Sequence, residues 1–207
     1  MAGKILKVAW LSVLLGIGME LLLLAVAAGA GTVPAVKPIV ADLVQKVSWS
    51  LFVCAGLACG TAASKTREAA MGLAGMITAP AAFQAARALH KSTLEALAIA
   101  GPAGGVPSPL TLAFLKAVEY GCLGIALGAI EKRGVGAKVY GLVGLVTGLV
   151  FAGIVVGLVV TSSPKPPAAA ALVSRAVNEL AFPIGCSLVL FATTAAGNAA
   201  RGSSTPR

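Results

Sequence analysis

Apolar residues gather in six long runs along this 207-residue chain, and shorter stretches with charged residues, glycine or proline separate the runs. A helix needs about 20 apolar residues to cross a hydrocarbon core about 30 Å thick, and each run comes near that length. The approximate bounds of the predicted spans are 5–28, 44–63, 69–87, 109–130, 139–161 and 169–195. We therefore predict an all-α, polytopic transmembrane helix bundle. Its six spans form a single transmembrane domain over 1–195, followed by a disordered C-terminal tail over 196–207.

Prolines influence both the expected helices and the segments between them. Pro80 and Pro183 lie inside predicted spans, where each is expected to kink its helix. The segments 30–43, 88–108 and 162–168 carry further prolines. Because the residue before a proline disfavours the helical conformation, these segments are expected to end each helix cleanly.

Two local patterns predict contact with the membrane surface. Leucines and oppositely charged residues at helical spacing over 87–97 indicate a short amphipathic helix on the interface, with His90 in water. Trp10 and Trp49 stand near span ends, as interfacial anchors do. Both patterns concern the borders of the bundle and add no span.

The first apolar run could also be read as a secretory signal, because Lys4 and Lys7 precede it and small residues end it. A signal core has about 7–15 apolar residues, whereas this run is longer and contains Glu20. We therefore expect the first span to be retained.

Composition excludes two other classes of chain. Apolar residues make up 58% and charged residues 11%, with a mean hydropathy of +0.95. Soluble domains carry roughly 25% charged residues, and disordered chains have low hydrophobicity. The net charge of +9 lies mostly between the apolar runs and is not interleaved with aromatic residues. We expect the lipid bilayer as a partner and no nucleic acid.

The same basic residues predict an orientation, because Lys and Arg favour cytoplasmic loops. A cytoplasmic N-terminus places nine of them inside and seven on the other side. The nine are Lys4, Lys7, Lys65, Arg67, Lys132, Arg133, Lys138, Arg201 and Arg207. We predict that both termini are cytoplasmic, in a prokaryotic-type plasma membrane or an equivalent organelle membrane.

Two helix hairpins resemble each other in sequence. MGLAGMIT at 71–78 matches YGLVGLVT at 140–147, and the preceding spans contain Lys46-Val47-Ser48-Trp49 and Lys116-Ala117-Val118-Glu119-Tyr120. We predict a tandem hairpin repeat whose copies run in the same direction through the membrane. The segment Arg175-Ala176-Val177-Asn178-Glu179 resembles the second of these starts, so the first and last spans could form a third hairpin.

Glycines recur at four-residue spacing on several helix faces, where the missing side chains allow close backbone approach. The pairs are Gly56/Gly60, Gly124/Gly128, Gly144/Gly148 and Gly153/Gly157. We expect these faces to pack inside the bundle. Contact with a membrane-protein partner or a second copy of the chain is the alternative.

Three acidic residues lie inside apolar runs, where a carboxylate costs at least a few kcal/mol unless it is paired, protonated or hydrated. They are Glu20, Glu119 and Glu179. A rise of 1.5 Å per residue brings all three to a similar depth. Lys116 lies three residues before Glu119, Arg175 lies four before Glu179, and both spacings keep the pair on one helix face. With Asn178, these residues form the predicted substrate- or ion-binding site, and structural ion pairs are the alternative.

No pattern for enzymatic chemistry accompanies these charges. The chain has one histidine, and its four cysteines lack metal-ligand spacing. We expect no enzymatic activity, no cofactor and no metal site. The favoured function is a small permease or ion-coupled transporter with a small-molecule or ion ligand. The alternatives are a non-transporting structural or assembly subunit of a membrane complex, and the substrate-binding subunit of a multi-component importer.

Overall fold

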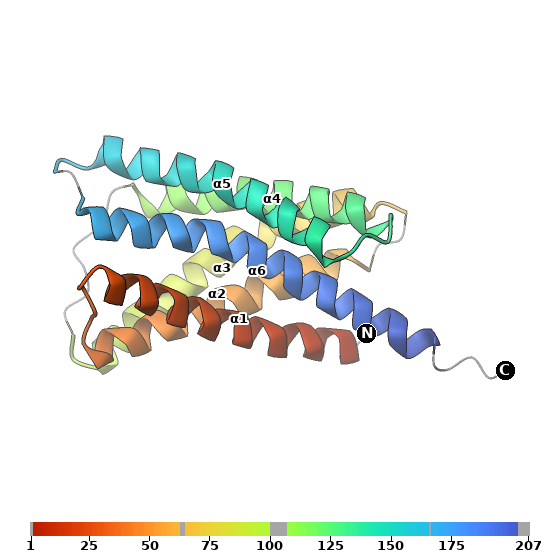
Figure 1. Cartoon of the computed structure of the whole chain (residues 1–207), viewed down its shortest axis with the longest axis horizontal. Helices are drawn as coiled ribbons and strands as arrows, with labels where there is room; N and C mark the ends of the chain where they lie inside the picture. Colours follow the sequence, from red (N-terminus) through yellow and green to blue (C-terminus); the bar gives the residue numbers. More distant parts are fainter. Residues whose placement is uncertain (1, 63–64, 100–106, 166, 203–207) are drawn as a thin grey trace.

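The computed structural model describes residues 2–62, 65–99, 107–165 and 167–202. Within these ranges the chain folds into six helices and no strands (Figure 1). The helices are α1 (Ala2–Gly29), α2 (Val36–Gly60), α3 (Arg67–Ala96), α4 (Pro109–Glu131), α5 (Ala137–Ser162) and α6 (Ala169–Gly202). All are long and apolar enough to cross a membrane. The predicted six-span helical bundle is therefore confirmed.

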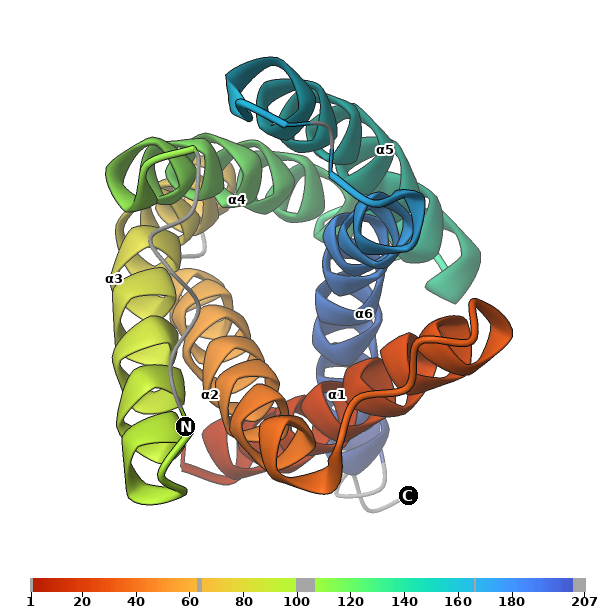
Figure 2. The same ribbon diagram turned by 90° about the vertical axis from the view of Figure 1, so that its left-hand side faces the viewer.

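The helices form a closed ring in chain order, because α1 packs against α6 as well as α2. Figure 2 shows this ring from one end, with α5 on its periphery against α4 and α6. Helix α6 also contacts α2 and α4 across the ring. The three even-numbered helices therefore approach one another at the centre, and residues from them can face a common space.

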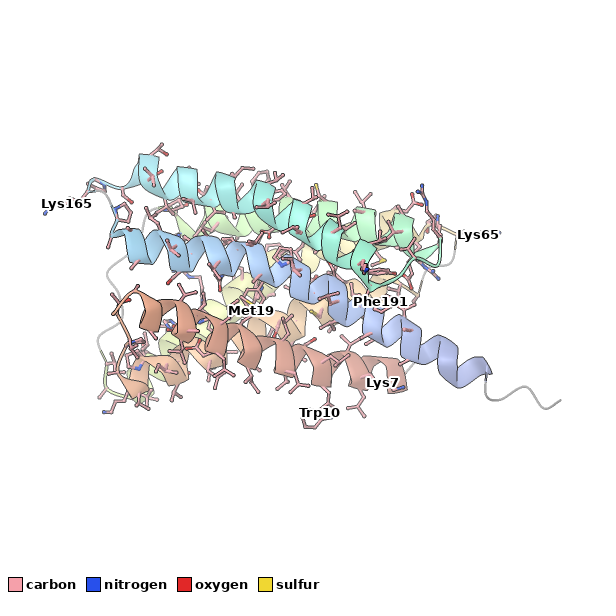
Figure 3. All side chains as sticks on the ribbon, in the orientation of Figure 1. Lys7, Trp10, Met19, Lys65, Lys165 and Phe191 are labelled. Atoms are coloured by element: carbon pink, nitrogen blue, oxygen red, sulfur yellow. The ribbon has the colours of Figure 1, made fainter. Side chains whose placement is uncertain are left out.

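Neighbouring helices run in opposite directions, so α1 begins and α6 ends at the same end of the bundle (Figure 1). Figure 3 shows Lys165 and Lys65 at opposite ends. We call the end with Lys165 end A and the end with Lys65 end B. Helices α2, α4 and α6 all begin at end A, which is the end that the sequence predicts to face away from the cytoplasm.

Helix α2 begins at Val36, earlier than the predicted start near residue 44. Pro38 was expected to stop a helix, but it occupies the first turn of α2. Backbone N–H groups of a first turn have no partner within the helix, so proline removes no hydrogen bond there. The extra turns extend α2 towards end A.

Helix α3 continues to Ala96, so the predicted separate surface helix over 87–97 is wrong. No proline or glycine interrupts the chain between Pro80 and the end of α3. The helix ends in a Schellman motif, in which Ile99 N–H donates to Leu94 O at 2.9 Å and Ala98 adopts a φ of 55°. The His90 side chain, which was expected to lie in water, is 21% exposed, and its Nε2 lies 3.1 Å from Asp42 Oδ1 on α2.

Helix α4 begins where the sequence predicts. Ser108 accepts a hydrogen bond from Thr111 N–H at 3.2 Å, and Pro109 is the first helical residue. Helices α3 and α6 continue through Pro80 and Pro183. Helix α6 also continues to Gly202, past the predicted border at 195, and residues 203–207 lie outside the described part of the chain.

Most of the glycine faces pack inside the bundle as predicted. A Cβ atom placed on Gly144 would lie 2.6 Å from Ile184 Cα, and one on Gly60 would lie 2.7 Å from Met71 Cα. The backbones of α5 and α6, and of α2 and α3, therefore touch at these residues. Gly153 and Gly157 differ, because within the described ranges no atom of another helix lies within 4 Å of a Cβ placed on either. For this pair the prediction of internal packing is wrong.

Candidate functional site

A cavity of about 330 Å³ lies between α1, α2, α3, α4 and α6. Its polar lining comes mainly from the even-numbered helices. These lining residues are Gln45, Lys46, Lys116, Ser174, Arg175, Asn178 and Glu179. The three basic residues stand within about 15 Å of the starts of their helices, by the rise of 1.5 Å per residue. The cavity therefore belongs to the half of the bundle nearer end A.

Lys116 holds two of the predicted carboxylates together. Its Nζ lies 2.7 Å from Glu119 Oε2 on the same helix and is also hydrogen-bonded to Glu179 Oε2 on α6. The Lys116 and Glu179 side chains are each only 9% exposed, and Glu119 is fully buried. The spacing of Lys116 and Glu119 in the sequence indicated the first contact. The contact with Glu179 joins α4 to α6, and the sequence of neither helix alone indicates it.

Arg175 does not form the ion pair with Glu179 that its four-residue spacing suggests. Over the described residues no carboxylate lies within ion-pair distance of Arg175, although its side chain lines the cavity. A basic residue before an acidic one is the weaker order for a pair within a helix. Glu179 instead meets Lys116, and Arg175 is left facing the cavity beside Asn178.

Glu20 lies apart from the other two carboxylates. Its Oε2 is 2.5 Å from Lys46 Nζ on α2, and both side chains are largely buried. Lys46 was not among the residues that we predicted for the site, although it begins one copy of the predicted repeat. Comparing Lys46 with Lys116 at the start of the other copy could have identified it.

A second cavity of about 370 Å³ adjoins the first. Its lining includes Thr32, Pro34 and Ala168, which belong to the connections at end A. Leu23, Lys46 and Ser174 line both cavities. The Glu20–Lys46 ion pair therefore stands where the two cavities meet.

Aromatic rings form the apolar wall of the central cavity. Trp49 makes edge-to-face contacts with Phe83 and Phe182 at centroid distances of 6.4 and 6.5 Å, and all three rings line the cavity. The prediction that Trp49 anchors the membrane interface is wrong, because only 7% of the residue is exposed. Trp10 is 65% exposed and projects from the outside of α1 (Figure 3).

Ion pairs join α3 and α4 at end B. Arg67 Nη1 lies 3.8 Å from Glu131 Oε1, and Lys132 Nζ lies 2.9 Å from Glu68 Oε1. Thr194 on α6 donates a hydrogen bond to Glu131 Oε1 at 3.3 Å. These contacts join α3, α4 and α6 at end B, and the two cavities lie nearer end A.

The arrangement can bind a charged solute. Lys46, Lys116 and Arg175 provide positive charge, Glu179 provides negative charge, and Gln45 and Asn178 offer amide groups. No group of three or more His, Cys, Asp or Glu side chains with metal-binding geometry occurs in the described ranges. Comparison with protein-family models, with curated proteins and with solved structures finds no match to this chain.

Proposed function

We propose that this chain is a small carrier that moves a solute across a membrane, with the central cavity as its binding site. The observation that carries the proposal is that Lys46, Lys116 and Arg175, from three alternate helices, line one cavity together with Glu179. Charged groups are costly within a membrane and tend to mark substrate or ion pathways. Stable packing of the helices alone would not require three basic residues around one cavity.

The position of the cavity supports alternating access. Its neighbouring cavity reaches the connections at end A, and ion pairs tie α3 to α4 at end B. This geometry fits a carrier that is accessible from end A. The Glu20–Lys46 ion pair lies where the two cavities meet and would act as a gate between them.

The predicted repeat gives a reason why three basic residues line one cavity. Lys46, Lys116 and Arg175 each begin one of the similar segments in the sequence. Carriers built from repeats place their binding sites where the repeats meet. We propose that three hairpins, α2–α3, α4–α5 and α6 with α1, each contribute one basic residue to the site.

Uptake by proteoliposomes tests the carrier function. We expect at least one solute from a panel of organic acids, amines, amino acids and sugars to accumulate in vesicles that contain the protein. Glu179→Gln should reduce this uptake, because Lys116 would lose a charged partner at the cavity wall. Glu95→Gln is the control, since Glu95 forms an exposed pair with Lys91 outside the cavity. The proposal fails if no solute is taken up, or if Glu179→Gln transports normally while folded.

Cysteine labelling tests access and orientation together. In a variant without the four native cysteines, Asn178→Cys should react with a membrane-impermeant maleimide added on the side of end A. Ser163→Cys, in the connection at end A, is the control that identifies that side. Labelling of Ser163→Cys from the cytoplasm would reject the predicted orientation. Labelling of Asn178→Cys from the side of end B alone would reject the proposed access route.

Docking to another membrane protein is the second candidate function, as an assembly subunit or as the substrate-binding subunit of an importer. The observation that favours it is that, among the described residues, no other helix comes within 4 Å of a Cβ placed on Gly153 or Gly157 of α5. Gly153→Leu should then release the protein from a complex that mild detergent extracts. Gly144 is unsuitable for this test because it packs against α6. Isolation of the wild-type protein as a monomer would reject this candidate.

A further inference from the structure

We infer that the solute is a small organic anion, with a carboxylate or similar group bound by Arg175 and an apolar part against the ring of Trp49. The inference rests on the carrier function, because it takes the central cavity as the solute site. It names a substrate class, which the carrier function alone leaves open.

The distribution of ion pairs around the cavity indicates the sign of the charge on the solute. Lys46 is neutralised by Glu20, and Lys116 is shared by Glu119 and Glu179. Arg175 lines the same cavity, yet no carboxylate of the described chain lies within ion-pair distance of it. A partly buried guanidinium gains most from a planar anion that accepts two parallel hydrogen bonds. The cluster as a whole balances three cations against three carboxylates, and Arg175 is the lining cation that has no carboxylate partner among the described residues, so it can bind an anion.

Glu179 does not offer a matching site for a cation. Its carboxylate already accepts a hydrogen bond from Lys116, whose ammonium lies between it and Glu119. A cationic group on a solute would have to share Glu179, which is only 9% exposed, with the ammonium of Lys116 while remaining near Arg175. Like charges in a site of low dielectric repel strongly, so such a solute is disfavoured.

The apolar wall and the volume define the rest of the solute. Phe83 and Phe182 each stand nearly at right angles to Trp49, and all three rings line the cavity, so a flat ring or short hydrocarbon can pack against them. The cavity of about 330 Å³ lies at the small end of the usual range for ligand sites. At about 30 Å³ for each water-sized group, it holds roughly ten non-hydrogen atoms. Benzoate has the required charge, shape and size.

Calorimetric titration of the full-length protein in nanodiscs tests the charge preference. The probes are benzoate, benzamide, benzylamine and phenylglycine, which share one ring but are anionic, neutral, cationic and zwitterionic. We expect benzoate to bind most tightly, and acetate, which lacks the ring, to bind more weakly. Equal or tighter binding of any of the three other ring compounds would overturn the inference.

Substitution of Arg175 tests the residue assignment. A hydrogen bond to a charged group is lost in Arg175→Gln, so the benzoate dissociation constant should rise roughly ten- to hundredfold. Arg175→Lys should restore part of the affinity because it restores the charge. Lys91→Gln removes a positive charge at the exposed end of α3 and should leave binding unchanged. Benzoate affinity that is unchanged in a folded Arg175→Gln variant would overturn the assignment.

Two results separate this inference from the carrier function. Uptake of amines or sugars by proteoliposomes, without binding or uptake of anions, would reject the organic-anion class and retain the carrier. Arg175-dependent binding of benzoate without uptake of any solute would retain the site and reject transport.

Discussion

Removing the ammonium of Lys116 should destabilise the bundle strongly. Lys116 is the shared partner of Glu119 and Glu179, and its side chain is only 9% exposed. Lys116→Met keeps most of the length of the side chain but leaves two carboxylates without their cation. Breaking a buried ion pair from one side costs about 3–5 kcal/mol, and the low exposure of these groups makes solvent screening small. We therefore expect a loss of free energy of unfolding within that range.

The free energy of unfolding can be measured by SDS titration of the protein in mixed micelles, with helix content as the signal. The triple variant Lys116→Met, Glu119→Met and Glu179→Met removes all three charges, so it should recover most of the lost stability. Lys91→Met is the matched control. Its pair with Glu95 is exposed, so the change should stay within about 0.5 kcal/mol. Wild-type stability in Lys116→Met, or a triple variant as unstable as the single one, would refute the reasoning.

Three further predictions concern packing, thiols and a helix end. Gly144→Leu should cost about 1–3 kcal/mol of stability in the same titration, because a Cβ would press on the main chain of α6, whereas Gly153→Leu should cost little; equal effects would contradict the described packing. The sulfur atoms of Cys54 and Cys186 lie 3.1 Å apart, so oxidation with copper phenanthroline should form a disulfide that links α2 to α6. After cleavage of the chain between α4 and α5, the two fragments should then migrate together on a gel without reductant, and fragments that separate would contradict this contact. Ala98→Gly should stabilise the protein by about 1 kcal/mol in thermal unfolding, since glycine adopts the positive φ of this residue without strain; a lower melting temperature would contradict it.

The site could be predicted only in part from the sequence. Glu20, Glu119 and Glu179 stand out because charge is rare in apolar runs, and helical spacing indicated the contact between Lys116 and Glu119. The contact of Lys116 with Glu179 crosses from α4 to α6, and the spacing within one helix instead suggested Arg175 as the partner. Residue spacing within one helix predicts contacts along that helix only, so it cannot predict an ion pair with a residue of another helix.

Trp49 shows the same limitation for the apolar part of the site. Its place near a predicted span border suggested an interfacial anchor, but α2 begins earlier than expected. The longer helix moves Trp49 inward, where Phe83 and Phe182 surround it. An error in one helix border therefore changed the interpretation of a residue that lines the central cavity.

The sequence by itself determined that this chain forms six membrane-spanning helices, because run length and apolar content are local properties that the bilayer selects directly. It also identified the carboxylates inside apolar runs, since an acidic residue in such a run is visible without knowledge of its partners. Only the tertiary structure decided which cation each carboxylate meets, which glycines face another helix and which basic residue remains open to the cavity. These outcomes depend on how the helices are rotated and shifted against one another. Such packing is set by contacts between residues far apart in the chain, which no local pattern encodes.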